Sequence, residues 1–243
     1  MTPKELILKR LTLLIFLFLT INTFAQDVPP FANITSVEYR GTGCDAESAR
    51  VVMTPDLTYL SVLYDRFSVE VGAGSASPLD QNQQKNCAII VKFDLPAGWS
   101  LQFDEVEYRG FVALPTASSV ARQMISVETL KGKGRNFQEN VIQGPKTENF
   151  VTVYKNPVIE QIGKVQSRPQ GLGNGKGKGR HNRSGDFFDC SDRTQQAVLK
   201  IRSRISVRNN GDKDHPLIKM IVDSTDASFN QKLKINWNQC IPG

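Results

Sequence analysis

Apolar and polar residues alternate along most of this chain, and helical periodicity is hard to find after residue 25. The segment from Cys87 to Leu95 is the clearest example, because apolar side chains recur at every second position while Lys92 and Asp94 fall between them. A period of two places successive side chains on opposite faces of an extended strand. β-branched and aromatic residues dominate the apolar stretches, as is typical of strands. We therefore expect an all-β protein.

The alternation, and the turn residues that interrupt it, predict a succession of short strands. We expect them at residues 34–40, 51–53, 59–64, 67–71, 87–95, 99–109, 112–114, 120–130, 197–207, 217–222 and 233–237. Many short strands joined by turns favour an antiparallel β-sandwich, with a jelly roll or a barrel as the alternative. Short links join the last three strands, so we expect these to form an antiparallel meander.

Two stretches lack this alternation. Residues 72–86 are rich in Gly, Ser, Asn and Gln and predict a long surface loop. Residues 131–185 are weakly patterned, and glycines alternate with Lys and Arg between residues 171 and 183. Such a composition resists packing, and its cations repel one another. We therefore expect a flexible basic loop at residues 164–186, within a single β domain that spans residues 26–243.

The first 25 residues have the layout of a secretory signal peptide. Basic residues precede an apolar run from Leu11 to Ile21, and Thr23 and Ala25 put small residues at the third and first positions before a cleavage site. The apolar run is about half of the roughly 20 residues that a membrane-spanning helix needs, which disfavours an N-terminal anchor. We expect cleavage after Ala25 and a secreted or periplasmic protein without a transmembrane segment.

Charge and motif content narrow the class of partner. The chain has 30 basic and 24 acidic residues, and residues 1–25 hold three of the former and one of the latter, which leaves 27 against 23, or +4. A dedicated nucleic-acid binder carries a stronger basic excess, so nucleic acid is not an expected partner. The Gly-rich stretch lacks the Gly-Lys-Ser/Thr ending of a phosphate-binding loop, and we expect no cofactor.

Four cysteines remain after cleavage, and an even number in an exported chain indicates disulfides. They allow three pairings. We favour Cys44–Cys87 with Cys190–Cys240, because each pair brackets one patterned half of the chain. A zinc site would need cysteine or histidine pairs a few residues apart, and the sequence has none of that spacing.

Several short segments, taken in order, are similar to a known secreted family. They are Ile34–Val37, Gly41–Cys44, Lys85–Cys87, Val106–Phe111, Gly144–Pro145, Asp223–Asp226 and Leu233–Cys240. Together they resemble the family named domain of unknown function 4360, over residues 33–240. The resemblance implies an exported, cysteine-bridged β domain and supplies no activity and no catalytic residues. The Gly/Lys-rich stretch at residues 171–183 looks like an insertion relative to that family.

The chain also contains one short internal echo. The sequence Val-Glu-Tyr-Arg-Gly at residues 37–41 recurs at residues 106–110. Five residues are too few to indicate a duplicated domain. We expect two similar strand ends, each of which finishes at a glycine turn.

The residues that carry most enzyme chemistry are sparse. His181 lies in the basic loop and His215 in a polar turn, and no Gly-Xaa-Ser-Xaa-Gly elbow is present. Four carboxylates gather near one expected strand pair, namely Asp94, Asp104, Glu105 and Glu107. Two facing carboxylates can hydrolyse a glycosidic bond, so a secreted polysaccharide hydrolase is the alternative function. Ordinary solvated strand faces and turns are the favoured explanation of these residues, and we expect no catalytic and no metal-binding residue.

The polar faces of two strands suggest a partner. Opposite the apolar faces of residues 197–208 and 232–237 lie six cations, namely Lys200, Arg202, Arg204, Arg208, Lys232 and Lys234. If both strands belong to one sheet, its outer face attracts an anionic polysaccharide or another cell-surface polymer. The competing interpretation is a solvated face whose lysines guard a strand edge. We therefore expect a non-catalytic extracellular binding or surface-interaction domain.

Overall fold

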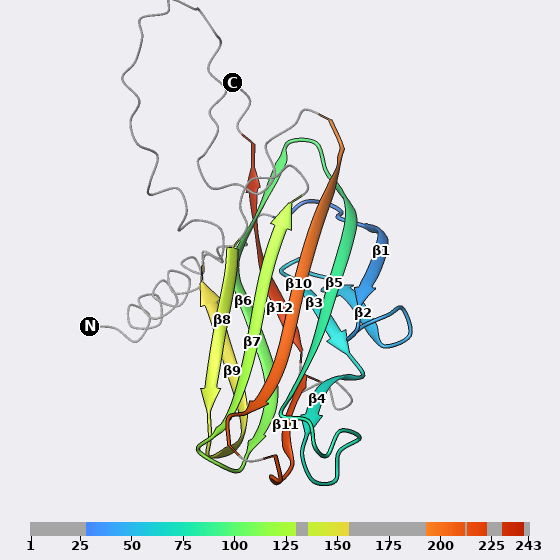
Figure 1. The fold of residues 1–243 in the computed structure, drawn as a ribbon. Coiled ribbons are helices and arrows are strands. Elements are labelled where there is room, and N and C mark those ends of the chain that lie inside the picture. Colours follow the sequence, from blue (N-terminus) through green and yellow to red (C-terminus); the bar gives the residue numbers. More distant parts are fainter. Residues whose placement is uncertain (1–27, 130–135, 156–192, 212, 223–229, 241–243) are drawn as a thin grey trace, which may run out of the picture.

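The computed structural model describes residues 28–129, 136–155, 193–211, 213–222 and 230–240, and every structural statement below concerns these residues. The expected signal peptide, the expected basic loop at residues 164–186 and the residues Cys190 and His181 lie outside them. Within the described ranges the chain forms twelve strands and no helix, which confirms the all-β prediction (Figure 1).

The strands build two antiparallel sheets. The five-stranded sheet has, in spatial order, β1 (Ile34–Gly41), β5 (Asn82–Leu95), β10 (Gln195–Asn209), β7 (Ser119–Thr129) and β8 (Asn136–Gln143). The seven-stranded sheet runs β2 (Ala49–Met53), β3 (Tyr59–Tyr64), β12 (Gln231–Gln239), β6 (Trp99–Leu114), β11 (Ile218–Val222) and β4 (Phe67–Val71), and β9 (Lys146–Lys155) pairs with β6.

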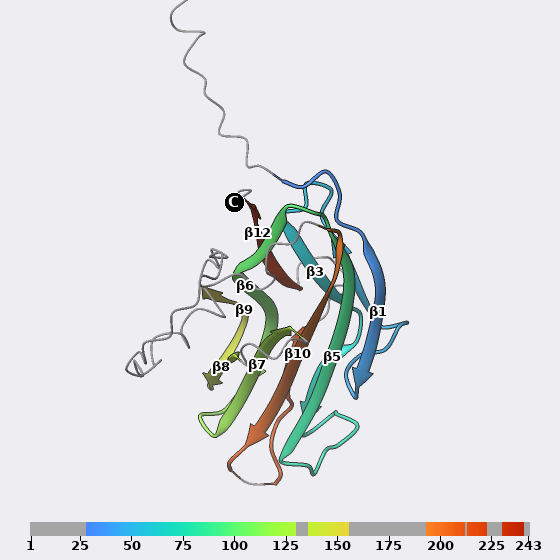
Figure 2. The ribbon, with the colours of Figure 1, turned by 90° about the horizontal axis from the view of Figure 1, so that it is seen from above.

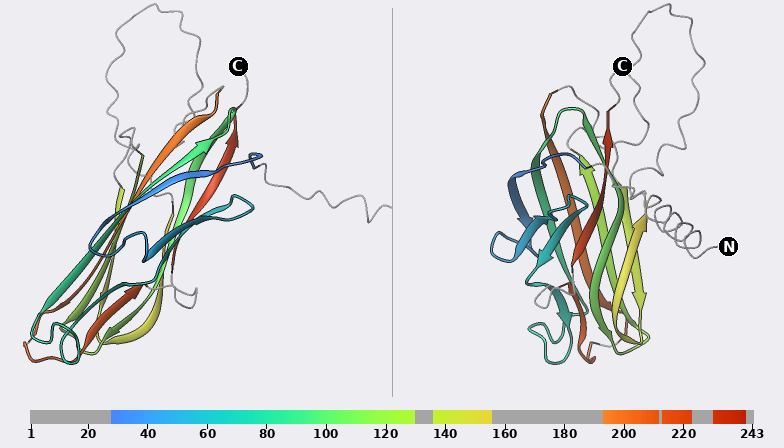
Figure 3. Two further views of the ribbon diagram at one scale, coloured as in Figure 1. Left: turned by 90° about the vertical axis from the view of Figure 1, so that its right-hand side faces the viewer. Right: turned by 180° about the vertical axis from the view of Figure 1, so that it is seen from behind.

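The two sheets pack face to face as a β-sandwich, which confirms the expected architecture. Figure 2 shows the layers from above, with β5, β10 and β7 in one and β6, β12 and β3 in the other. The strands of both layers run roughly along the long axis of the molecule (Figure 3). Most inward side chains are apolar, and Phe67, Phe93 and Phe103 are each at most 1% exposed. Each strand buries every second residue between the sheets, and its remaining residues lie on the outer face of its own sheet.

The long strand β6 organises the seven-stranded sheet. Its residues 99–108 pair with β12 and its residues 111–113 pair with β11, while residues 105–114 pair with β9. The overlap of these ranges means that β12 and β11 follow each other along one edge of β6 and that β9 takes the other edge. Gly110 of β6 admits this crowding, because a Cβ there would lie 2.5 Å from the carbonyl oxygen of Ile221 and 2.7 Å from the ring of Phe150.

Several sequence-based expectations were wrong in detail. The loop expected at residues 72–86 is shorter, because β5 already begins at Asn82. Residues 112–114 are the end of β6 and not a separate strand. The expected meander of the last three strands does not form, since β10 lies in the other sheet from β11 and β12, and these two pair with β6 and not with each other. Strands β8 and β9 were not expected at all.

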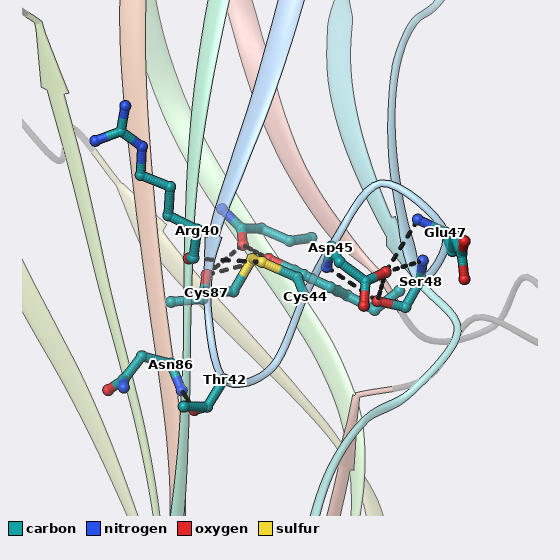
Figure 4. The surroundings of a disulfide bond; sticks show 11 residues. Arg40, Thr42, Cys44, Asp45, Glu47, Ser48, Asn86 and Cys87 are labelled. Carbon is teal, nitrogen blue, oxygen red and sulfur yellow. Dashed lines mark hydrogen bonds between the residues drawn. A yellow bond between two sulfur atoms is a disulfide. The ribbon is translucent and has the colours of Figure 1, made fainter.

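The disulfide between Cys44 and Cys87 confirms the first expected pairing. It ties the segment that follows β1 to the middle of β5, and both cysteines are buried (Figure 4). Next to it, Asp45 Oδ1 accepts hydrogen bonds from the backbone nitrogens of Glu47 and Ser48 and from the Ser48 hydroxyl. These bonds, the Ser48 hydroxyl first, lower the pKa of Asp45. Cys240 is also disulfide-bonded. Its expected partner Cys190 is not among the described residues, so that pairing stays a prediction.

Candidate functional site

The six expected cations do not share one face. Lys200, Arg202, Arg204 and Arg208 point outward from β10, the central strand of the five-stranded sheet. Lys232 and Lys234 point outward from β12, which belongs to the seven-stranded sheet. The expectation of a single six-cation face is therefore wrong, because alternation shows which side of a strand is polar and not which sheet holds the strand.

The β10 cations form a row along the middle of the five-stranded sheet. Residues two apart on a strand are about 7 Å apart, so the row from Lys200 to Arg208 extends over about 27 Å. Arg204 Nε donates to Asn86 Oδ1 at 3.2 Å, and an Arg202 nitrogen lies 3.2 Å from a Glu128 carboxylate oxygen. We call this outer side of the five-stranded sheet the cationic face.

A shallow groove of about 260 Å³ crosses the cationic face between β5, β10 and β7. Its rim carries Arg202 and Arg204, and the small side chain of Ala88 leaves room beside them. Across the sheet Ala88 lies between Arg202 on β10 and Arg40 on β1, whose guanidinium pairs with Glu38. The groove therefore offers planar, multiply donating groups that suit carboxylate, sulfate or phosphate oxygens.

The whole cationic face carries a basic excess. Seven basic side chains point outward from the five-stranded sheet, namely Arg40, Lys92, Arg122, Lys200, Arg202, Arg204 and Arg208. Four acidic ones accompany them, namely Glu38, Asp94, Glu128 and Glu139. Glu38 pairs with Arg40 and Lys92, and Glu139 pairs with Arg122. Among the described residues Lys200, Arg204 and Arg208 make no ion pair, although Lys200 lies opposite Glu128 across the β10–β7 pair.

The opposite outer face has a groove of a different kind. We call it the β6 groove, and it has a volume of about 270 Å³. Its lining residues are Thr54, Tyr59, Ser61, Glu105, Glu107, Arg109, Lys232 and Lys234. A β-bulge in β6 shapes it, because Lys234 pairs with Glu105 while the next residue, Ile235, pairs with Phe103. The bulge leaves Asp104 unpaired and gives β6 an extra outward carboxylate.

Glu107 is held as a carboxylate. Arg109 Nε donates to Glu107 Oε1 at 2.6 Å, and Glu107 is only about one-fifth exposed. The hydrogen bond from Arg109, with the further attraction of Arg109 and Lys232, lowers the pKa of Glu107. A general acid of a glycosidase needs a raised pKa, so Glu107 is unsuited to that role. Asp94, the fourth carboxylate of the expected group, lies on the cationic face and not with the other three.

The internal echo folds into two copies of one local geometry. At residues 37–41 and 106–110 alike, the arginine forms an ion pair with the glutamate two residues earlier, at 3.1 Å in Arg40–Glu38 and 2.6 Å in Arg109–Glu107. The two pairs lie on opposite outer faces of the sandwich. The expectation of two strand ends holds for β1, which ends at Gly41, and is wrong for β6, which continues through Gly110.

A layer of buried polar side chains lies between the two grooves. Ser203, which separates Arg202 from Arg204, donates to Gln231 Oε1 at 2.7 Å. Tyr64 Oη donates to the same oxygen at 3.2 Å, and on β7 the Gln123 Oε1 atom accepts from Tyr154 Oη at 2.9 Å.

Three atoms of this layer make no well-formed hydrogen bond among the described residues, namely Tyr108 Oη, Gln123 Nε2 and Gln231 Nε2, and Ser203 is the hydroxyl near Tyr108. Burial raises the pKa of Tyr64 and of Tyr108 and brings that of Tyr154 to about 12.

Histidine and metal chemistry find little support in the described part of the chain. His215 is buried and its ring nitrogens lie 2.9 Å from the Pro216 carbonyl oxygen and 3.2 Å from that of Asp80, so it fastens two loops together. No group of three or more His, Cys, Asp or Glu side chains in those residues is placed to hold a metal ion. Nor do those residues include a helix long and apolar enough to cross a membrane.

Comparison with known proteins gives distant relatives. An "Uncharacterized secreted protein" of Arthroderma benhamiae is 21% identical over 213 residues, which cover 87% of this chain and 73% of that protein. Among solved structures, TmCBM61 in complex with β-1,4-galactotriose covers 85% of this chain and 90% of its own, at 7% identity and a TM-score of 0.24.

A family 11 carbohydrate-binding module from Clostridium thermocellum, solved with a β-1,3-1,4-mixed-linked tetrasaccharide, covers 79% of this chain and 86% of its own. Its identity is 13% and its TM-score 0.16. The family profile described as Domain of unknown function (DUF4360) matches residues 31–168, which are more than half of the chain. This range includes β1 to β9 and the Cys44–Cys87 disulfide. The chain therefore belongs to the family of domain of unknown function 4360.

Proposed function

We propose that this protein is an extracellular, non-catalytic binding domain whose cationic face holds an anionic polymer. The observation that carries the proposal is the row of four cations on β10, at the centre of the sheet and beside a groove of about 260 Å³. Lys200 and Arg208 are uncompensated by any ion pair among the described residues, and Arg202 and Arg204 flank the groove.

The length of the row favours a polymer over a small anion. A polymer that lies along β10 meets a positive charge about every 7 Å from residue 200 to residue 204, and again at residue 208. Single exposed ion pairs contribute only about 0–1 kcal/mol, so several must act together for useful affinity. An acidic polysaccharide or a teichoic-type polymer of the cell surface presents repeated charges of this kind.

Three features support an extracellular, non-catalytic role. The N-terminal pattern of a signal peptide and the Cys44–Cys87 disulfide both suit an oxidising compartment outside the cytoplasm. The relative from Arthroderma benhamiae is described as secreted. In the β6 groove Glu107 is neutralised by Arg109, which suits binding better than proton transfer.

The test is binding of the purified mature protein to a sulfated polysaccharide, heparin, and to polygalacturonate. Binding is expected at low ionic strength and should weaken steeply towards moderate salt, because ions screen exposed charges over about 8–10 Å. The double variant Arg202→Glu with Arg204→Glu should abolish it.

The matched control reverses two charges on the other side of the sandwich, Lys232→Glu with Lys234→Glu. Both double variants change the net charge equally, so the control separates a located site from a general charge effect. If the β10 variant binds as well as the unaltered protein, or if both variants lose binding to the same degree, the cationic face is not the site.

A further inference from the structure

The β6 groove contains charged side chains that form no ion pair although side chains of opposite charge lie near them. Lys234 lies directly opposite Glu105 across the β12–β6 pair, and cross-strand neighbours of opposite charge commonly form ion pairs. Yet among the described residues neither Lys232, Lys234 nor Glu105 makes one. Lys234 and Glu105 are therefore available to bond to a ligand, whereas Lys232 lies opposite Glu107 and attracts its carboxylate.

The charges of the groove nearly cancel. Arg109, Lys232 and Lys234 face Glu105 and Glu107, and the Arg109–Glu107 pair at 2.6 Å is already closed. The groove therefore lacks the positive field of the cationic face and is not suited to a polyanion. The groove places hydrogen-bond donors and acceptors side by side. Adjacent hydroxyl groups of a ligand can bond to both kinds, because each hydroxyl both donates and accepts.

Tyr59 and Ser61 extend this pattern along β3. Tyr59 is half-buried beside Lys234, and Ser61 lies opposite Lys232, so an aromatic ring and a hydroxyl line the side of the groove away from β6. A partly exposed tyrosine ring offers an apolar surface with a polar end. A pyranose ring has the matching pair of properties, namely a C–H face and a rim of hydroxyls.

We propose that the β6 groove is a second binding site, for a short uncharged segment of a polysaccharide. The volume of about 270 Å³ is at the small end of ligand pockets, which are commonly about 300–1,000 Å³. The site therefore contacts a short stretch of the polymer and binds it weakly. Glu105 and Lys234 bond to neighbouring hydroxyls, Tyr59 packs against the sugar ring, and the Arg109–Glu107 pair forms a fixed floor.

The two sites are placed back to back. Tyr108 lies between the groove residues Glu107 and Arg109 along β6, and its cross-strand partner is Gln231, which bonds to Ser203 under the cationic face. Only the buried layer between the sheets, about 10 Å thick, separates the two sites. One molecule can thus hold a neutral polymer on one side and an anionic polymer on the other.

The experiment is sedimentation with insoluble neutral polysaccharides, namely β-glucan, galactan, mannan and xylan, at low and moderate salt. At least one of them should retain the protein, with little effect of salt. Tyr59→Ala and Glu105→Gln should each weaken that retention about tenfold or more, equivalent to about 1.4 kcal/mol. Both side chains are half-buried at the surface, and an unchanged thermal midpoint would show that the variants fold.

The double variant Arg202→Glu with Arg204→Glu serves as the matched control and should bind the neutral polysaccharide normally. Failure of the proposed anionic site would leave this result unaffected, so the two proposals fail separately. Retention by none of the four polymers, or equal retention of the groove variants and the unaltered protein, overturns the inference. So does binding at the β6 groove that only polyanions show and that salt removes.

Discussion

Tyr64 and Tyr108 make a matched pair for which we predict opposite effects of losing a hydroxyl group. Both side chains are fully buried in the same polar layer between the sheets. Tyr64 Oη donates to Gln231 Oε1 at 3.2 Å and contacts Ser203 Oγ at 3.3 Å. Tyr108 Oη makes no well-formed hydrogen bond among the described residues, although the nearby Ser203 hydroxyl partly offsets the rise that burial causes in its pKa. Tyr→Phe removes only the oxygen in each case, so the comparison isolates the hydrogen bond.

The magnitudes follow from the state of each oxygen. A satisfied buried hydrogen bond contributes about 0.5–1.5 kcal/mol, and leaving a buried polar atom unpaired costs about 1–3 kcal/mol. Tyr64→Phe should therefore destabilise the protein by about 1–2 kcal/mol. Tyr108→Phe removes an oxygen whose desolvation no well-formed hydrogen bond offsets, and should be neutral or should stabilise by up to about 3 kcal/mol.

Urea unfolding monitored by fluorescence measures both effects, provided that the slope of the transition is the same in all three proteins. A thermal scan should agree, with a shift of about 2–4 °C per kcal/mol for a chain of this size. If Tyr108→Phe destabilises as much as Tyr64→Phe, then Tyr108 Oη is hydrogen-bonded in solution, through an ordered water molecule for example. The premise that the Tyr108 hydroxyl is buried without a well-formed hydrogen bond would then be refuted.

Four further outcomes are expected. Burial raises the pKa of Tyr64, Tyr108 and Tyr154 above the value of about 10 that tyrosine has in the unfolded chain, so the free energy of unfolding should fall as the pH rises above that value. The ultraviolet absorbance of tyrosinate from these residues should appear together with unfolding and not before it. Gly110→Ala should cost about 1–3 kcal/mol in denaturant unfolding, because the new Cβ would lie 2.5 Å from the carbonyl oxygen of Ile221. Replacing Cys44 and Cys87 with serine opens a loop of 43 residues and should destabilise the protein by about 4 kcal/mol, while non-reducing peptide mapping should join Cys190 to Cys240.

Strands whose inner residues are mostly apolar could be predicted from the sequence. β10 is such a strand, because Ala197, Leu199, Ile201, Ile205 and Val207 mark every second position except Ser203. The strands β8 and β9 escaped detection because they lie at the margins of their sheets. Their inner side includes Asn140 and Thr152, which hydrogen-bond to each other at 2.8 Å, so polar residues occupy positions where the alternation needs apolar ones.

The assignment of strands to sheets could not be read from the alternation. Lys232 and Lys234 show the same polar-out pattern as the β10 cations, and only pairing partners far along the chain place them on the opposite side. The β-bulge at Asp104 could not be predicted for a related reason. Two successive outward residues, Asp104 and Glu105, interrupt the alternation in the same way as a turn would. The candidate residues were therefore found individually, whereas their grouping into two sites required the fold.

The central positions of β10 and β12 have a consequence for how the chain matures. Each lies in the interior of its sheet, β10 between β5 and β7 and β12 between β3 and β6, although they are among the last strands to be synthesised. Until residues 195–239 are available, neither sheet can close, and the earlier strands lack the neighbours that would hold them together. We therefore expect each sheet to be completed only when β10 and β12 have paired with their neighbours, so a chain that ends before residue 195 should not reach this fold.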